Sequence, residues 1–171
     1  MIDPKMQDAL NKQINAEIYS AYLYLSMEAY FEANALGGFA NWMRIQYQEE
    51  MSHALKIFDF INERGGQVHL TAIDAPATEW GSPVEVFEVT LEHEREVSAS
   101  IHRLVDLAIE ISDHATNQML QWFVEEQVEE EATAEQILDE LNLIGEARSG
   151  LFMLNRELGQ RTFVDETKEA E

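Results

Sequence analysis

Glycine and proline, the residues that helices tolerate least in their interiors, are confined to a few stretches of this 171-residue chain. They leave four long segments free of both residues, at about 5–36, 39–64, 84–111 and 114–144. Apolar side chains recur in these segments at steps of three and four, the period of a helix with one buried face. The spacing therefore predicts four long helices.

Two helix starts are marked by capping residues. Ser82 is placed to be an N-cap, with Pro83 at the first helical position and Glu85 completing a capping box. Asp113 is a second candidate N-cap, for the segment that follows it. These signals predict that helices begin at about residues 83 and 114.

The connections predict how the helices are arranged. The first, around Leu36 to Gly38, and the third, around 112–113, are short and indicate antiparallel hairpins. The second, Gly65 to Ser82, has about eighteen residues, enough to return along the bundle. The fold class is therefore all-α, a four-helix bundle with a long crossover between helices two and three. A short fifth helix is expected after Gly145; its apolar residues are Leu151, Phe152, Leu154 and Leu158.

The length predicts a single domain of residues 1–164, followed by a charged, disordered tail at 165–171. The 33 acidic and 11 basic side chains give a net charge of −22, which attracts cations and disfavours nucleic acids and anionic membranes as partners. No cysteine is present, so thiolate metal sites are excluded. With no basic leader and no apolar stretch of about 20 residues, a cytoplasmic protein is expected.

A glutamate with a partner motif 33 residues later occurs twice. Glu17 is followed by the pair Glu50 and His53, and Glu94 is followed by the pair Gln127 and Glu130. The two members of each pair are three residues apart, at i and i+3, which puts them on one face of a helix. One carboxylate on each of two helices, plus such a pair on each of two others, is how a four-helix bundle encloses two metal ions. An internal salt-bridge network is the alternative, but these apolar stripes lack lysine and arginine. We therefore predict a dinuclear metal centre.

The ligand types favour iron or manganese, and zinc less exclusively. Tyr24, seven residues after Glu17, lies on the same helical face and is a candidate hydrogen-bond partner or electron donor, although core packing is the commoner role. Glu126, Glu129 and Glu130 form a ridge at i, i+3 and i+4. With Glu49, this ridge predicts an additional cation site next to the pair.

The chain resembles the non-haem ferritins of bacteria and archaea over nearly its whole length. The resemblance is carried by four motifs in matching order: NAEIYSAYLYLSM, NWMRIQYQEEMSHA, LEHE and WFVEEQVEEE. It implies a homo-oligomeric cage of twenty-four subunits that oxidises Fe(II) with dioxygen and stores ferric mineral. The implied fold is the ferritin-like bundle, whose short fifth helix lines the four-fold pores.

The resemblance also implies roles for the stripe residues. Glu17, Glu50, His53 and Glu130 would bind the two irons of the ferroxidase centre, with Glu50 bridging. Glu94 would lie close to the second iron or bind it, and Gln127 would lie beside it as a further metal residue. Tyr24 and Trp122 would match proposed electron donors. A third iron would bind the site formed by four glutamates: Glu49, Glu126, Glu129 and Glu130.

Two alternatives stay open. Bacterioferritins bind haem through a methionine, and Met51 occupies that position, but their fourth helix carries a second Glu-x-x-His pair where this chain has Gln127 and Glu130. The sequence therefore favours the class without haem. The second alternative is a di-iron oxidase or peroxidase of the wider group that stores no mineral.

Overall fold

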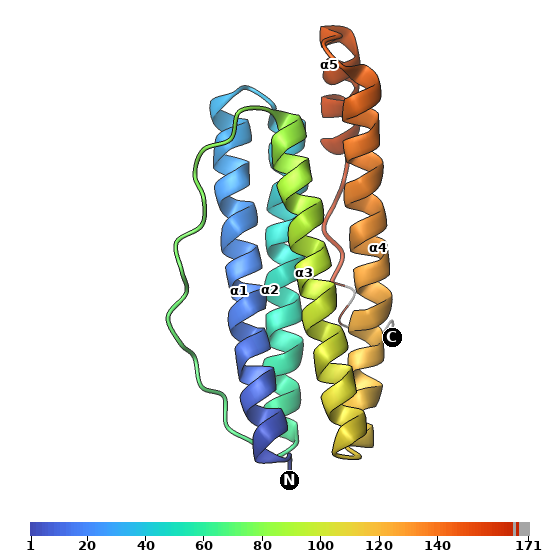
Figure 1. Ribbon diagram of the computed structural model, residues 1–171. Coiled ribbons are helices and arrows are strands. Elements are labelled where there is room, and N and C mark those ends of the chain that lie inside the picture. Colours follow the sequence, from blue (N-terminus) through green and yellow to red (C-terminus); the bar gives the residue numbers. More distant parts are fainter. Residues whose placement is uncertain (166, 168–171) are drawn as a thin grey trace.

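The computed structural model describes residues 1–165 and residue 167. Within these residues there are five α-helices and no strand (Figure 1). The helices are α1 (Pro4–Ala33), α2 (Gly37–Glu63), α3 (Pro83–Glu110), α4 (His114–Ile144) and α5 (Arg148–Leu158). The predicted all-α class and the short fifth helix are confirmed.

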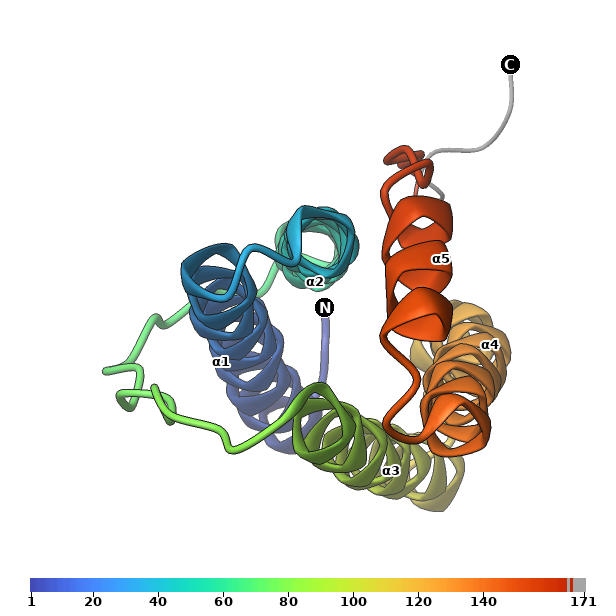
Figure 2. The ribbon, with the colours of Figure 1, turned by 90° about the horizontal axis from the view of Figure 1, so that it is seen from above.

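The four long helices form two antiparallel hairpins that pack side by side. Helices α1 and α2 make one hairpin, and α3 and α4 make the other (Figure 1). The segment 64–82 returns along the outside of α1 from one end of the bundle to the other, as the predicted crossover requires. Seen along the bundle axis, α5 lies across one end, between α2 and α4 (Figure 2).

Side-chain caps begin three of the long helices. The Asp3 carboxylate accepts a hydrogen bond from the Lys5 N–H at 2.8 Å. At α3 the Ser82 hydroxyl accepts from the Glu85 N–H at 3.2 Å, and at α4 the Asp113 carboxylate accepts from the Thr116 N–H at 3.1 Å. The two predicted caps, Ser82 and Asp113, are therefore confirmed.

The first hairpin turn differs from the prediction. Helix α1 ends at Ala33 and α2 already begins at Gly37, so the two glycines lie in the first turn of α2 and not in the connection. Ala35 instead takes the left-handed conformation, with φ of 57°. The α2 N-terminus is capped from another helix: the Asn155 side-chain oxygen on α5 accepts from the N–H groups of Gly38 at 2.8 Å and Phe39 at 3.2 Å.

The apolar core is divided into two clusters along the bundle. One contains Phe31, Phe39, Trp42 and Phe87 near the α5 end, and the other contains aliphatic side chains of α1, α2 and α3 with Phe123 of α4. Buried acidic and amide side chains lie on the same helices between these residues. The core therefore surrounds a polar layer, which is where the predicted ligands are.

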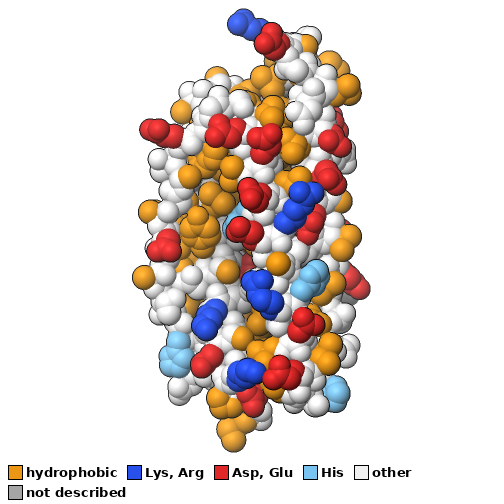
Figure 3. Space-filling view, viewed as in Figure 1, with side chains coloured by type: hydrophobic (Ala, Val, Ile, Leu, Met, Phe, Trp, Pro, Cys, Tyr) orange, Lys and Arg blue, Asp and Glu red, His pale blue; other side chains and the backbone are white. Residues whose placement is uncertain are grey.

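Acidic side chains form no single dominant patch on the face shown in Figure 3. Acidic side chains are spread over the face shown in Figure 3, with basic ones among them. In the described part of the chain, no helix has the length and apolar character needed to cross a bilayer. Of the predicted disordered tail, residues 166 and 168–171 lie outside the described residues, and the domain boundary at 164 stays a prediction.

Candidate metal centre

All six residues of the doubled motif are buried in the polar layer. Helix α1 contributes Glu17, α2 contributes Glu50 and His53, and α3 contributes Glu94, with exposed fractions between 0% and 3%. The last two, on α4, are only slightly more accessible: Gln127 is 5% exposed and Glu130 is 6% exposed. Each lies on an otherwise apolar helical stripe, and packing that stripe inward carries the polar side chain into the core.

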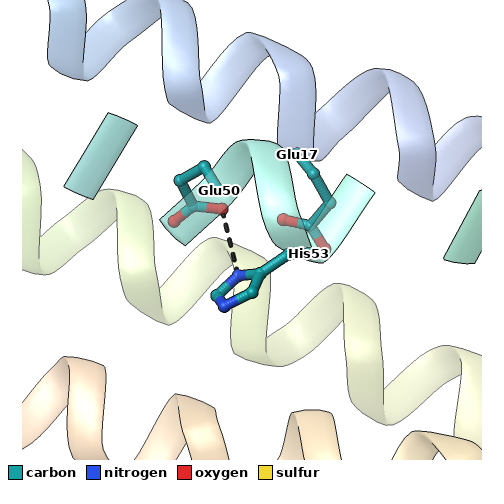
Figure 4. Close-up of side chains that lie close together, drawn as sticks. All are labelled: Glu17, Glu50 and His53. Carbon is teal, nitrogen blue, oxygen red and sulfur yellow. Dashed lines mark ion pairs between the residues drawn. The ribbon is translucent and has the colours of Figure 1, made fainter. Parts of the chain in front are cut away.

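Three of these residues converge closely. One ligand atom from each of Glu17, Glu50 and His53 lies within 4.8 Å of the other two. Figure 4 shows the carboxylate of α1 facing the carboxylate and imidazole of α2. The His53 Nδ1 atom is 3.4 Å from Glu50 Oε2. The i, i+3 spacing puts Glu50 and His53 on one face of α2, and the α1–α2 hairpin brings Glu17 to it.

Two oxygens of this cluster have no hydrogen-bond partner within the described residues. They are Glu17 Oε2 and Glu50 Oε2, both inaccessible to solvent. The second Glu17 oxygen accepts from the Gln13 side-chain amide at 2.9 Å. A buried carboxylate oxygen without a donor is costly, and a bound cation removes that cost. The two orphaned oxygens next to an imidazole therefore fit a metal ion.

The charges at the centre favour the same interpretation. Burial, with the nearby Glu94 charge, raises the pKa of Glu17 to about 7. Burial, followed by the charges of Glu94 and Glu17, raises the pKa of Glu50 well above its usual value. Burial, with the Lys56 charge, lowers the pKa of His53 to about 4, so its imidazole is neutral at pH 7 and does not compensate the carboxylates. A neutral imidazole is also the form that binds metals.

The other carboxylates of the motif are held by neutral donors. The Tyr24 hydroxyl donates to Glu94 Oε1, and the Gln127 amide donates to Glu94 Oε2 at 3.0 Å. Burial, with the charge of Glu94, raises the pKa of Tyr24 well above its usual value, so the phenol keeps its proton. Glu130 Oε2 accepts from the Gln46 amide at 2.8 Å. Glu94 and Glu130 are thus oriented in the core but lie outside the three-residue cluster.

The residues predicted to form an additional cation site are in a different environment. Along α4, Glu126 is half-buried, Glu129 is exposed and Glu130 is buried. On α2, the Glu49 carboxylate is half-buried, and both of its oxygens accept hydrogen bonds from the Arg161 side chain, at 2.8 and 3.0 Å. The close cluster found among the described residues contains none of these four glutamates.

The family follows from the sequence match. The family model of the ferritins, described as the ferritin-like domain, matches residues 7–144, which is most of the chain. The chain belongs to the ferritin family. A bacterial non-heme ferritin of Bacteroides fragilis is 50% identical over 161 residues, covering 94% of this ferritin chain and 100% of the relative. A second, from Staphylococcus saprophyticus, is 44% identical over 163 residues, covering 95% and 98%.

Solved ferritin structures have the same fold. An engineered closed form of the Archaeoglobus fulgidus ferritin superposes with a TM-score of 0.95 at 55% identity, covering 96% of this chain and 100% of that one. The open-pore ferritin of the same archaeon superposes with a TM-score of 0.93 at 55% identity, covering 95% and 100%. The ferritin-like architecture predicted from the sequence is therefore confirmed.

The sequence prediction missed several residues that contact the motif. Gln13 and Gln46 donate to Glu17 and Glu130, and each precedes a motif glutamate by four residues on the same helical face. That spacing was a usable signal. Ser98, which accepts from Gln127 at 3.4 Å, and Arg161, which follows α5, had no comparable signal.

The aromatic residues singled out from the sequence lie against the centre. The Trp122 ring is edge-on to the His53 ring, with centroids 5.3 Å apart, and Lys56 Nζ lies 4.6 Å from the Trp122 ring centroid. The Tyr24 ring is edge-on to Trp42, with centroids 6.4 Å apart. Tyr24 thus touches a motif carboxylate directly, whereas Trp122 touches the imidazole.

Proposed function

We propose that this ferritin-family chain is a ferroxidase and iron store that oxidises Fe(II) with dioxygen inside its helical bundle. The observation that carries the proposal is the pair of orphaned, buried oxygens, Glu17 Oε2 and Glu50 Oε2, beside the neutral imidazole of His53. The iron ions are the substrate of this reaction. Each Fe(II) loses one electron, and dioxygen accepts the electrons.

The ligand chemistry supports iron as the substrate. Hard carboxylate oxygens with a single imidazole suit Fe(II), and they favour Fe(III) still more because its charge is higher. A divalent ion at Glu17, Glu50 and His53 would replace the protons that burial holds on these carboxylates at neutral pH. The protein supplies placement and charge compensation, and the metal supplies the redox chemistry.

We place the second ion between Glu50 and the residues of the other hairpin, Glu94, Gln127 and Glu130. The two Glu94 oxygens accept from Tyr24 and Gln127, but each carboxylate oxygen has a further lone pair available to a metal. Tyr24 orients Glu94 and is placed to supply an electron. The third-iron site at Glu49, Glu126, Glu129 and Glu130 is a further part of the proposal.

Storage requires a closed assembly, and we propose a homo-oligomeric cage of twenty-four subunits. The net charge of −22 would draw Fe²⁺ towards it. A cytoplasmic location and the absence of haem stay predictions. A particle of small mass that turns over without accumulating iron would instead indicate the non-storage oxidase, and a haem absorption band would indicate a bacterioferritin.

The test removes one ligand at a time. Glu50→Ala and His53→Ala should each slow rapid Fe(II) oxidation by roughly 100-fold or more, since even residues that only support metal ligands commonly contribute 10- to 100-fold. Stopped-flow absorbance measures the rate, and anaerobic Fe²⁺ titration measures binding. Glu92→Ala, an exposed position on α3, is the matched control and should behave as wild type.

Helical circular dichroism should be retained in all three variants. Wild-type oxidation rates in both Glu50→Ala and His53→Ala would refute the assignment of the site. Absence of stoichiometric Fe²⁺ binding by the wild-type protein would refute the proposed function as a whole.

A further inference from the structure

Arg161, three residues beyond the end of α5, reaches back to the acidic side of the metal centre. Its Nη2 donates to both oxygens of Glu49, at 2.8 and 3.0 Å, and its Nη1 donates to the Gln46 side-chain oxygen. The guanidinium carbon also lies 5.1 Å from the Trp42 ring centroid. A planar guanidinium with several donors can satisfy all three partners at once, which a lysine ammonium cannot do in the same geometry.

Gln46 connects this cation to a motif residue. Gln46 is fully buried; its oxygen accepts from Arg161 and its amide nitrogen donates to Glu130 Oε2 at 2.8 Å. Because an amide has one acceptor end and one donor end, the bond to Arg161 fixes which end faces Glu130. Arg161 thus contacts one predicted third-site glutamate directly and another through a single side chain.

The backbone around Arg161 is fixed to α2. The Asn41 side-chain amide donates to the carbonyl of Leu158 at 3.2 Å and to that of Arg161 at 3.0 Å. One turn earlier, the Asn155 side chain caps the start of α2. The docking of α5 onto α2 therefore sets the position of the guanidinium.

We propose that Arg161 is a built-in cation that competes with the third iron for Glu49 and positions Gln46 against Glu130. This inference rests on the proposed function and refines it. A third ion that takes Glu49 as a ligand either displaces the guanidinium or binds beside its positive charge, and in both cases the docked Arg161 weakens its binding. By thermodynamic linkage, the docked Arg161 weakens binding of the third ion by the same factor as the ion weakens docking of Arg161.

The electrostatics at Glu130 agree with this geometry. Burial, followed by the charges of Glu94 and Glu49, raises the pKa of Glu130 well above its usual value, while the Gln46 hydrogen bond and the Arg161 charge act in the opposite direction. Arg161 therefore already provides part of the compensation that a third cation would provide.

The test is anaerobic calorimetric titration of the assembled protein with Fe²⁺. In Arg161→Gln, the affinity for the third equivalent should rise about tenfold or more, because the variant removes both the charge next to Glu49 and the hydrogen bonds from Nη2 to its two oxygens. Arg156→Gln is the matched control: it removes the same charge from an exposed position on α5 and should leave the third affinity at the wild-type value. A residue with only a structural role would weaken binding when removed, and would not strengthen it.

Should Arg161→Gln fail to assemble, Arg161→Lys replaces it. The lysine keeps the charge but loses the planar group that donates to Glu49 and Gln46 at the same time, so a smaller gain in third-site affinity is expected. The role of Arg161 is overturned if the Arg161 variant that assembles binds the third Fe²⁺ equivalent with the same affinity as Arg156→Gln. This result differs from failure of the proposed function, in which the wild-type protein would not bind even the first two equivalents.

Discussion

Glu17, Glu50 and His53 are close together in a core that contains no nearby ammonium or guanidinium hydrogen-bonded to them within the described residues. Burial and mutual repulsion act against ionisation of both carboxylates. The centre therefore destabilises the metal-free protein at neutral pH and becomes favourable when a divalent ion binds. The same residues that make the site reactive towards metals make it costly to fold without them.

A pH dependence of the stability of the metal-free protein follows from Glu17. Its pKa is raised from 4.5 to about 7 on folding, so the folded state binds more protons between these values, and stability falls as pH rises through this window. A shift of this size corresponds to about 3 kcal/mol. Glu17→Gln should therefore be more stable than wild type, by a difference that grows from pH 5 to pH 8.

Denaturant unfolding of the metal-free proteins measures that difference. Comparing the two proteins is necessary because His53 changes stability with pH in the opposite direction. Its pKa falls from 6.5 to about 4 on folding. Its contribution to the free energy of unfolding is therefore complete above pH 6.5 and is lost as pH falls towards 4. Glu92→Gln, at an exposed position, should show no pH-dependent difference. A Glu17→Gln difference that is constant across this range would contradict the prediction.

Among the helices, α5 has a structural role that its length does not indicate. It caps α2 through Asn155, contacts Asn41 through the Leu158 carbonyl and places Arg161 beside Glu49. Gly38 permits this docking, because a Cβ at that position would overlap the backbone carbonyl of Asn155. At the neighbouring Gly37, a Cβ would have no other atom within 4 Å, so a side chain fits there.

These adjacent glycines give a prediction about the α2–α5 contact. Gly38→Ala should displace α5 and destabilise the protein by more than the roughly 1 kcal/mol that loss of a helix cap costs. Gly37→Ala should leave stability unchanged or slightly higher, since alanine has the better helix propensity. Hydrogen exchange across residues 148–158 and thermal unfolding measure the two effects. Equal protection of α5 in both variants would show that the close approach is not required.

The whole subunit leaves large apolar side chains exposed near α5. Leu143 is 88% exposed, Phe152 is 62% exposed and Met153 is 71% exposed. Exposed large apolar side chains that are adjacent, such as Phe152 and Met153, commonly mark a contact with another protein. In a homo-oligomeric cage, the end of the bundle that carries α5 would therefore be a subunit interface.

A charge on this surface should weaken the assembly. Light scattering coupled to size exclusion should give wild type a mass about twenty-four times that of the denatured subunit. Phe152→Lys should shift the population to smaller species, because burying an unpaired ammonium is costly. Gln160→Lys adds the same charge at an exposed polar position just beyond α5 and should assemble normally. An unchanged mass for Phe152→Lys would remove this surface from the interface.

Much of the fold was predictable because the signals are local. The helices and the crossover were predicted from features that involve residues only a few positions apart. These features are four segments without interior glycine or proline, the caps at Ser82 and Asp113, and a connection of about eighteen residues. Two amides of the site, Gln13 and Gln46, were also within reach, since each lies one turn from a motif glutamate. The first turn was misplaced because both glycines lie in the first turn of α2, where Gly38 permits the close approach of α5 and not the hairpin turn itself.

The sequence by itself determined the helical periodicity, and with it the burial of six polar side chains on apolar stripes. Only the tertiary structure decided which of them meet. Glu17, Glu50 and His53 converge, Glu94 is held by Tyr24, and Glu49 is paired with Arg161, 112 residues away. The physical reason is that periodicity is set by backbone geometry within one helix, whereas these contacts depend on how separate helices dock, and no local pattern specifies that.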